Sequence, residues 1–174
     1  MKQEPHIPLV FAVYPTTRGF AFVLFQSLLS PYDWGVRSVR HRDKNTHSLR
    51  AIADLIKQYR PDVVVIEDTS SKGSRRSSRI RRLYRSISAF AEGEGIEVYG
   101  YDRDAIRVCF AQYEARSKYE IAKVIALHIE EFSHRLPPKR KIWQAEDGRQ
   151  SLFDAASLAL CFYAVHGHVF GKAP

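Results

Sequence analysis

The chain has 174 residues, of which 45% are hydrophobic, and its formal net charge is +8. This length is enough for one domain with a buried core, and the composition excludes a disordered or fibrous chain. A basic excess of this size favours a polyanionic partner such as a nucleic acid.

The cysteines and the apolar stretches predict a reduced, cytoplasmic protein with no membrane span. Cys109 and Cys161 form no Cys-x-x-Cys pair, so we expect neither a disulfide framework nor a zinc cage. No signal peptide is recognisable, and the apolar stretch 7–25 is interrupted by prolines, an arginine and a glycine. The second apolar run, 152–165, contains Asp154, which would be costly in lipid.

The first third of the chain predicts three antiparallel strands. The aromatic and β-branched run 9–14 is followed by the turn 15–19 and a second apolar run, 20–28. Ser30 and Pro31 interrupt that run, and the segment 34–40 alternates apolar with basic residues, as in a strand near a sheet edge.

The next segment changes from strand to helical spacing and back. Apolar residues over 49–59 predict a helix with Asn45 or Thr46 as its N-cap and Pro61 at its end. The continuous Val/Ile run within 62–68 then predicts a central parallel strand that is buried on both faces.

The second half of the chain predicts four helices around one more strand, and no internal repeat or long linker divides it. Ser117 and Glu120 form a capping box at the start of one of the helices. The expected elements are a basic helix over 76–91, a strand over 96–101, a short helix over 104–112, a helix from 117 to 132, a basic loop over 133–145 and a last helix over 147–165.

Two acidic side chains follow the predicted central strand. Sites of α/β proteins form at the carboxyl ends of such strands, and this strand ends at Glu67 and Asp68. A carboxylate at the boundary of the core ionises only where a cation or a donor compensates it. We therefore predict a catalytic role for Glu67 and Asp68, with a solvated acid just past the strand as the ordinary alternative.

Two further acids lie in the predicted last helix. Asp147 and Asp154 are seven residues apart, so two turns of helix would place both on one face. Asp154 is surrounded by apolar residues and must face a cleft or a partner, with Arg149 or Arg18 as the candidate ion-pair partner. Carboxylates from separate elements are what Mg²⁺ or Mn²⁺ requires, so we predict a metal site formed by Glu67, Asp154 and Asp147.

Two clusters of basic residues accompany the predicted acidic site. Seven cations and no acid lie between 72 and 85, and arginines donate bidentate hydrogen bonds to phosphates. A second cluster precedes Trp143, an aromatic residue on which a base could stack, although a plain surface loop explains it equally well. The predicted DNA-binding residues are Arg75, Arg76, Arg79, Arg82, Arg85, Lys118, Lys139 and Arg140.

Four segments, in their order along the chain, carry a resemblance to a known family. They are the hairpin 13–21, the strand 61–67, the helix start 117–121 and the helix 153–160. Together they resemble the RuvC-type Holliday-junction resolvases of the ribonuclease H-like superfamily, over residues 9 to about 165. The resemblance implies a single ribonuclease H-like α/β domain over 1–174, with three antiparallel strands plus parallel strands in one mixed five-stranded sheet flanked by helices.

The resemblance also implies an activity. That family cuts branched DNA with two magnesium ions held by four acids, and it acts as a dimer. Glu67 matches the second acid and Asp154 the last, while Ser151 stands where another acid is usual and Asp147 could substitute for it. An alternative register makes Asp154 the third acid and Ser157 the missing fourth.

Tyr14 stands where the resemblance expects the first aspartate. A phenol with a pKa of about 10 is a poor Mg²⁺ ligand at neutral pH. The resemblance therefore implies a protein that binds branched DNA as a homodimer and acts as a Mg²⁺-dependent endonuclease, with its catalysis impaired or lost because Tyr14 replaces the first acid. The alternatives are a non-catalytic DNA-binding module of the same fold, a ribonuclease or transposase-like member of the superfamily, and an assembly protein that shares only the fold.

Overall fold

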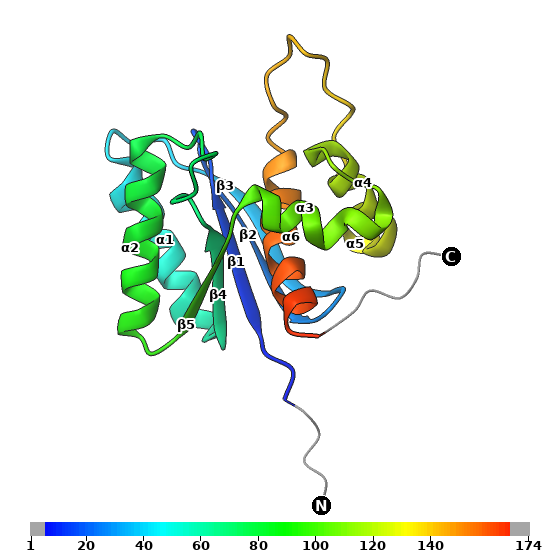
Figure 1. The fold of residues 1–174 in the computed structure, drawn as a ribbon. Helices are drawn as coiled ribbons and strands as arrows, with labels where there is room; N and C mark the ends of the chain where they lie inside the picture. Colours follow the sequence, from blue (N-terminus) through cyan, green and yellow to red (C-terminus); the bar gives the residue numbers. More distant parts are fainter. Residues whose placement is uncertain (1–5, 168–174) are drawn as a thin grey trace, which may run out of the picture.

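The computed structural model describes residues 6–167, and a mixed five-stranded sheet lies at their centre (Figure 1). The strands are β1 (Val10–Pro15), β2 (Gly19–Ser27), β3 (Ser30–Ser38), β4 (Val63–Glu67) and β5 (Glu97–Tyr101), in the spatial order β3-β2-β1-β4-β5. β1, β2 and β3 pair antiparallel, whereas β4 is parallel to β1 and β5 is parallel to β4. The predicted fold class is confirmed.

Helices cover both faces of the sheet (Figure 1). On one face lie α1 (Lys44–Tyr59) and α2 (Ser78–Gly93). The other face carries α3 (Arg103–Phe110), the 3₁₀ turn η1 (Ala111–Tyr113), α4 (Lys118–His128), α5 (Glu130–Ser133) and α6 (Gln150–Val165). No helix in the described part of the chain is long and apolar enough to cross a membrane.

The alternation of side chains along the strands fixes which residues can meet on each face. Val10, Ala12 and Tyr14 of β1 belong to the core cluster that includes α6, whereas Phe11 and Val13 pack against α1 and α2. The period of two also places Glu67 on the same side of the sheet as Val65. Tyr14 and Glu67 therefore end two adjacent parallel strands on the face that α6 covers.

The hairpin between β1 and β2 requires its glycine. A Cβ atom at Gly19 would overlap the carbonyl oxygen of Arg37 on the neighbouring strand β3. The Thr16 hydroxyl accepts a hydrogen bond from the Gly19 amide, at 3.1 Å, and closes the turn. This turn holds the end of β1, and with it Tyr14, in place.

Several predicted boundaries were wrong. β3 begins at Ser30 and not at Trp34, because it is an edge strand and an edge tolerates Pro31, which donates no ladder hydrogen bond. The N-cap of α1 is Asp43, which accepts from the Thr46 amide, and not Asn45 or Thr46. The helix predicted through Phe132 is interrupted at Ile129, whose backbone is extended.

Two further boundary errors affect predicted site residues. α2 starts at Ser78 and not at residue 76, so Arg75 and Arg76 both precede the helix. α6 starts at Gln150, so Asp147 is not on the last helix and the predicted shared face with Asp154 is wrong. The Asp147 side chain instead accepts a hydrogen bond from the Arg149 amide at 2.9 Å, a local turn that competes with helix formation.

Candidate functional site

Residues from five segments converge where β1 and β4 end. Tyr14 comes from β1, Glu67 from β4, Lys118 from the first turn of α4 and Asp154 from the second turn of α6. These four side chains line a cavity of about 20 Å³, which has room for about one water molecule. Arg76, from the segment that precedes α2, closes the group.

Lys118 binds the acidic residue of α6. Its ammonium lies 3.1 Å from Asp154 Oδ2 and 3.0 Å from Glu146 Oε1, and it donates to the Tyr14 hydroxyl at 3.2 Å. Gln150 donates to the other oxygen of Asp154 at 3.3 Å. Asp154 is only 7% exposed, so Lys118 and Gln150 supply the compensation that a buried carboxylate requires.

Arg76 binds the acidic residue of β4. Its Nε lies 3.1 Å from Glu67 Oε2, which also accepts from the hydroxyl of buried Tyr84 at 3.4 Å. The guanidinium is 4.5 Å from the centre of the Tyr14 ring, donates to the Tyr14 hydroxyl at 3.3 Å and reaches the carbonyl of Pro15. Tyr14 thus lies between the two cations and accepts from both.

Burial and charge set the protonation of the group. Burial raises the pKa of Tyr14, the charge of Asp154 raises it further, and the nearby cations oppose both effects, so the phenol is neutral at physiological pH. Burial likewise raises the pKa of Asp154 against the opposing effect of Lys118. Burial alone would lower the pKa of Lys118, but Asp154 and Glu146 outweigh it and raise that pKa, so the ammonium stays charged.

No protein-family model and no curated protein matches the sequence. Solved structures do match. Thermus thermophilus RuvC in complex with a Holliday junction substrate matches with a TM-score of 0.61 at 17% identity, over 94% of this chain and 98% of that one. A second T. thermophilus RuvC structure also gives 0.61 at 17% identity, over 92% of this chain and 97% of that one. The yeast mitochondrial Holliday junction resolvase Ydc2 matches with a TM-score of 0.58 at 14% identity, over 95% of this chain and 84% of that one.

The chain has the RuvC fold. This agrees with the resemblance found in the sequence, and the structural match extends over nearly the whole length of this chain and of the RuvC chains. At this level of identity the match concerns the fold, so the chemistry of the site has to be judged from its own residues.

The residues present do not fit the two-metal centre expected of a RuvC-like nuclease. Glu67 and Asp154 each have a cation within 3.1 Å, and Tyr14 offers a neutral phenol where a carboxylate would be needed. Within residues 6–167, no three His, Cys, Asp or Glu side chains are arranged to hold a metal ion. A divalent cation would have to displace Arg76 or Lys118, which are partly buried and bound to these same acids.

The other predicted acids lie outside this group. Asp68 accepts hydrogen bonds from the amide and hydroxyl of Ser70 at 2.9 and 2.6 Å, so it stabilises its own loop. Asp147 forms an ion pair with Arg149 at 2.8 Å. Ser151 donates to the carbonyl of Gly148, so it takes part in the start of α6. Asp154 therefore pairs with Lys118, and neither Arg149 nor Arg18 is its partner.

The predicted phosphate-binding residues divide into two groups. Arg76 and Lys118 bind acids, so the prediction that the basic segment is uncompensated was wrong for Arg76. Arg79 donates to the Thr16 carbonyl at 2.9 Å and to Asn45 at 3.1 Å, and thereby joins α2 to the β1–β2 hairpin. The remaining predicted DNA-binding residues are exposed, and none of them forms an ion pair within the described part of the chain. They are Arg75, Arg82, Arg85, Lys139 and Arg140.

Sequence reasoning missed three members of the group. Tyr84 and Gln150 carry no charge, and only the fold brings them to Glu67 and Asp154. Glu146 is not among the acids that the sequence analysis selected, yet it shares Lys118 with Asp154. None of these three residues has a local signal in the sequence, whereas the capping box fixes Lys118 as the first residue of α4.

Proposed function

We propose that this protein binds branched or otherwise structured DNA and does not hydrolyse it. The observation that carries the proposal is the pairing of Glu67 with Arg76 and of Asp154 with Lys118. Metal-assisted phosphodiester cleavage needs carboxylates that are available to a metal ion. Here side chains of the protein already neutralise the two central carboxylates.

The exposed cations support DNA as the partner. Arg82 and Arg85 extend from α2, Arg75 precedes it, and Lys139 and Arg140 lie in the loop before α6. Phosphate contacts by such groups dominate affinity for nucleic acids, and the net charge of +8 acts in the same direction. The branched form is proposed because a RuvC of the same fold was solved with a Holliday junction substrate.

The decisive experiment measures binding and cleavage in the same samples. A labelled four-way junction and a linear duplex of matching sequence are titrated with protein, once in EDTA and once in Mg²⁺ or Mn²⁺. We expect preferential binding of the junction, equal affinity with and without metal, and no product. Failure to bind any DNA at low salt would overturn the binding role.

A metal-dependent endonuclease is the second candidate. It is favoured by the presence of three carboxylates, Glu67, Glu146 and Asp154, around Arg76 and Lys118. Metal-dependent product that disappears in Glu67→Gln would establish it and overturn our first proposal. Tyr14→Asp is the more stringent test, because it places a carboxylate where the resemblance expects the first metal-binding aspartate. We expect it to remain inactive, since both cations stay in place.

Two further readouts use the same samples. Branched and linear RNA substrates test the ribonuclease alternative, for which we expect weaker binding and no product. Light scattering of the protein alone and with the junction measures its mass, and the proposed homodimer predicts twice the mass of the chain. A monomer that binds the junction would remove the dimer from the proposal and leave DNA binding intact.

A further inference from the structure

The segment that joins α5 to α6 extends away from the body of the protein as an arm, here defined as residues 137–149 (Figure 1). Its base is fixed. Pro137 is buried, preceding Leu136 packs against the core, and Glu146 reaches Lys118 at 3.0 Å. The arm therefore rises from the same end of the molecule as the group around Tyr14.

The tip of the arm is a tight turn with two apolar side chains at its centre. The Gln144 amide donates to the Lys141 carbonyl at 3.0 Å, and the Lys141 amide donates to the Gln144 side chain at 3.0 Å. This double closure places Ile142 and Trp143 at the two central positions, where they are 97% and 79% exposed.

These residues are unusual for a solvent-exposed turn. Gly, Pro, Asn, Asp and Ser dominate such positions because their backbones or side chains suit the geometry. An isoleucine and a tryptophan there expose a large apolar area and belong to neither core cluster of the described residues. Large aromatic side chains displayed in this way are typical of a surface that meets a partner.

The charges around the tip indicate which partner. Lys139, Arg140 and Lys141 lead up to Trp143, and none of them forms an ion pair within residues 6–167. The Lys141 ammonium lies 5.3 Å from the centre of the Trp143 ring. An aromatic face beside several cations is the arrangement that binds an unpaired base together with its phosphates.

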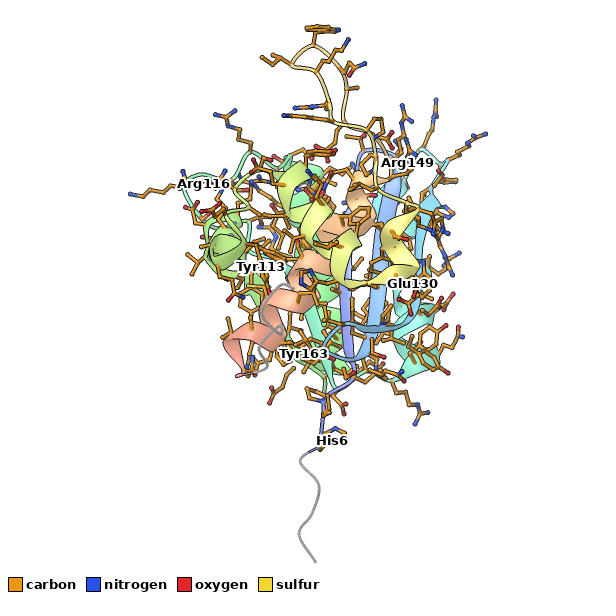
Figure 2. The ribbon with its side chains drawn as sticks, turned by 90° about the vertical axis from the view of Figure 1, so that its right-hand side faces the viewer. His6, Tyr113, Arg116, Glu130, Arg149 and Tyr163 are labelled. Carbon is orange, nitrogen blue, oxygen red and sulfur yellow. The ribbon has the colours of Figure 1, made fainter. Side chains whose placement is uncertain are left out.

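A groove beside the arm continues the basic surface. It has a volume of about 1210 Å³, and Arg103 and Arg107 of α3, Arg116, and Lys139 and Arg140 of the arm line it. Four acids also line it: Glu146 and Asp147 are paired with Lys118 and Arg149, Glu120 caps α4, and Glu114 forms no ion pair within residues 6–167. Arg107 is itself paired with Asp104 at 2.9 Å, so Arg103, Arg116, Lys139 and Arg140 are the cations of the groove that remain for a ligand. Arg116 lies at the same end of the molecule as Arg149, the last residue of the arm (Figure 2). The groove is large enough for several nucleotides.

We propose that the arm binds an unpaired stretch of DNA, with one base stacked on Trp143, the phosphates held by Lys139, Arg140 and Lys141, and the strand lying in the groove along α3. The proposal rests on the proposed DNA-binding function and adds to it the recognition of unpaired bases near a branch.

Tryptophan fluorescence tests the stacking directly, because the chain has two tryptophans. Trp34→Phe leaves Trp143 as the reporter, and Trp143→Phe leaves Trp34, which is half-buried against Phe132 at 5.3 Å. Titration with a single-stranded thymidine oligonucleotide is expected to quench the first variant to saturation and to leave the second unchanged. Equal responses in both variants would overturn the proposal.

An affinity comparison separates this inference from the function on which it rests. Trp143→Ala is expected to weaken binding to a fork with one unpaired arm by about 5- to 100-fold, the usual effect of losing one stacked base. Binding to a fully paired four-way junction should change by less than about twofold. If the protein binds the junction and Trp143→Ala leaves its affinity for the fork unchanged, the stacking proposal is wrong and the proposed DNA-binding function stands. If neither DNA binds, the proposed function fails as well.

Anionic lipid vesicles provide the opposing control. A tryptophan beside lysines is also suited to a membrane surface. Phosphatidylserine vesicles are therefore added to the Trp34→Phe variant without DNA. No spectral change is expected. A saturable blue shift with vesicles, together with no quenching by the oligonucleotide, would assign the tip to a membrane and overturn the DNA proposal.

Discussion

Lys118 forms ion pairs with two carboxylates, those of Glu146 and Asp154, and donates to the Tyr14 hydroxyl. Taking a carboxylate out of water costs several kcal/mol, and an ion pair offsets this only while both partners are present. Asp154 is 7% exposed and depends on Lys118 for an opposite charge. Loss of either charge therefore leaves the other in a poor environment.

The variant Lys118→Met tests this dependence. It keeps the length of the side chain and removes the charge, so the free energy of unfolding should fall by about 3–5 kcal/mol. Lys123→Met, at an exposed position on the same helix, is the matched control and should change it by less than about 0.5 kcal/mol. Urea unfolding measures both. Equal effects of the two variants would contradict the proposed role of the buried pair.

Asp154 gives a pH dependence of known sign. Because burial raises its pKa above the ordinary 3.8, the folded protein holds this proton more tightly than the unfolded chain. The resulting stability is present at low pH and is lost as the pH rises through the raised pKa. Asp154→Asn does not titrate, so its free energy of unfolding should improve relative to wild type as the pH rises above about 4 and through the raised pKa of Asp154. Urea unfolding at several pH values measures the difference, and an opposite trend would show that Lys118 outweighs burial.

For single residues, the sequence predicted which acids meet in one cavity better than it predicted the partners of those acids. Glu67 and Asp154 were selected because one ends a buried strand and the other interrupts an apolar helix, and both line one cavity. Their cations were not predictable from spacing. Arg76 and Lys118 lie 9 and 36 residues away from the acids they bind, and only the fold brings them together.

Among the elements, α4 has the clearest sequence signal for its first residue, a capping box. Ser117 accepts from the Glu120 amide at 3.2 Å, and the Glu120 side chain accepts from the Ser117 amide at 2.9 Å. This capping box was predicted from the sequence and is confirmed. The box matters for the site because Lys118 is the first residue of the helix that it begins.

Ser117→Ala is expected to destabilise the protein by about 1 kcal/mol, because the helix loses an acceptor for an unpaired amide. Ser117→Asn, which caps nearly as well, should restore most of the loss. Thermal unfolding monitored by circular dichroism compares the three proteins. If the asparagine variant is as unstable as the alanine variant, the effect does not arise from the cap.

Element boundaries were predictable where the signal was local and were missed where tertiary or side-chain contacts decided. The bounds of the buried strand β4 follow from its composition, and the presence of the basic helix α2 follows from its period, although α2 begins only at Ser78. The start of α6 does not, because the side chain of Asp147 binds the Arg149 backbone and delays the helix by three residues. Pro31 was taken as a strand breaker because its edge position is a property of the sheet order.

For the whole molecule, the excess of positive charge should govern DNA affinity. Removing Arg75, Arg82 and Arg85 together is expected to weaken binding to all DNA forms and to reduce the slope of log affinity against log salt by about 1 for each phosphate that these arginines neutralise. Lys57→Ala is the control, since this exposed residue near the end of α1 lies over Phe90. Fluorescence anisotropy over a salt series measures the slopes, and an unchanged slope in the triple variant would exclude these arginines from the interface.

The two ion pairs beside Tyr14, Glu67 with Arg76 and Asp154 with Lys118, also limit how this protein can evolve. A change of Tyr14 to aspartate adds a fourth acid to the three that already bind these two cations, and the loss of Arg76 or Lys118 alone leaves a buried carboxylate unpaired. Each single step therefore carries a stability penalty before any metal can bind. Substitutions at these positions should be strongly epistatic, so a route between this state and a metalloenzyme requires several replacements made together.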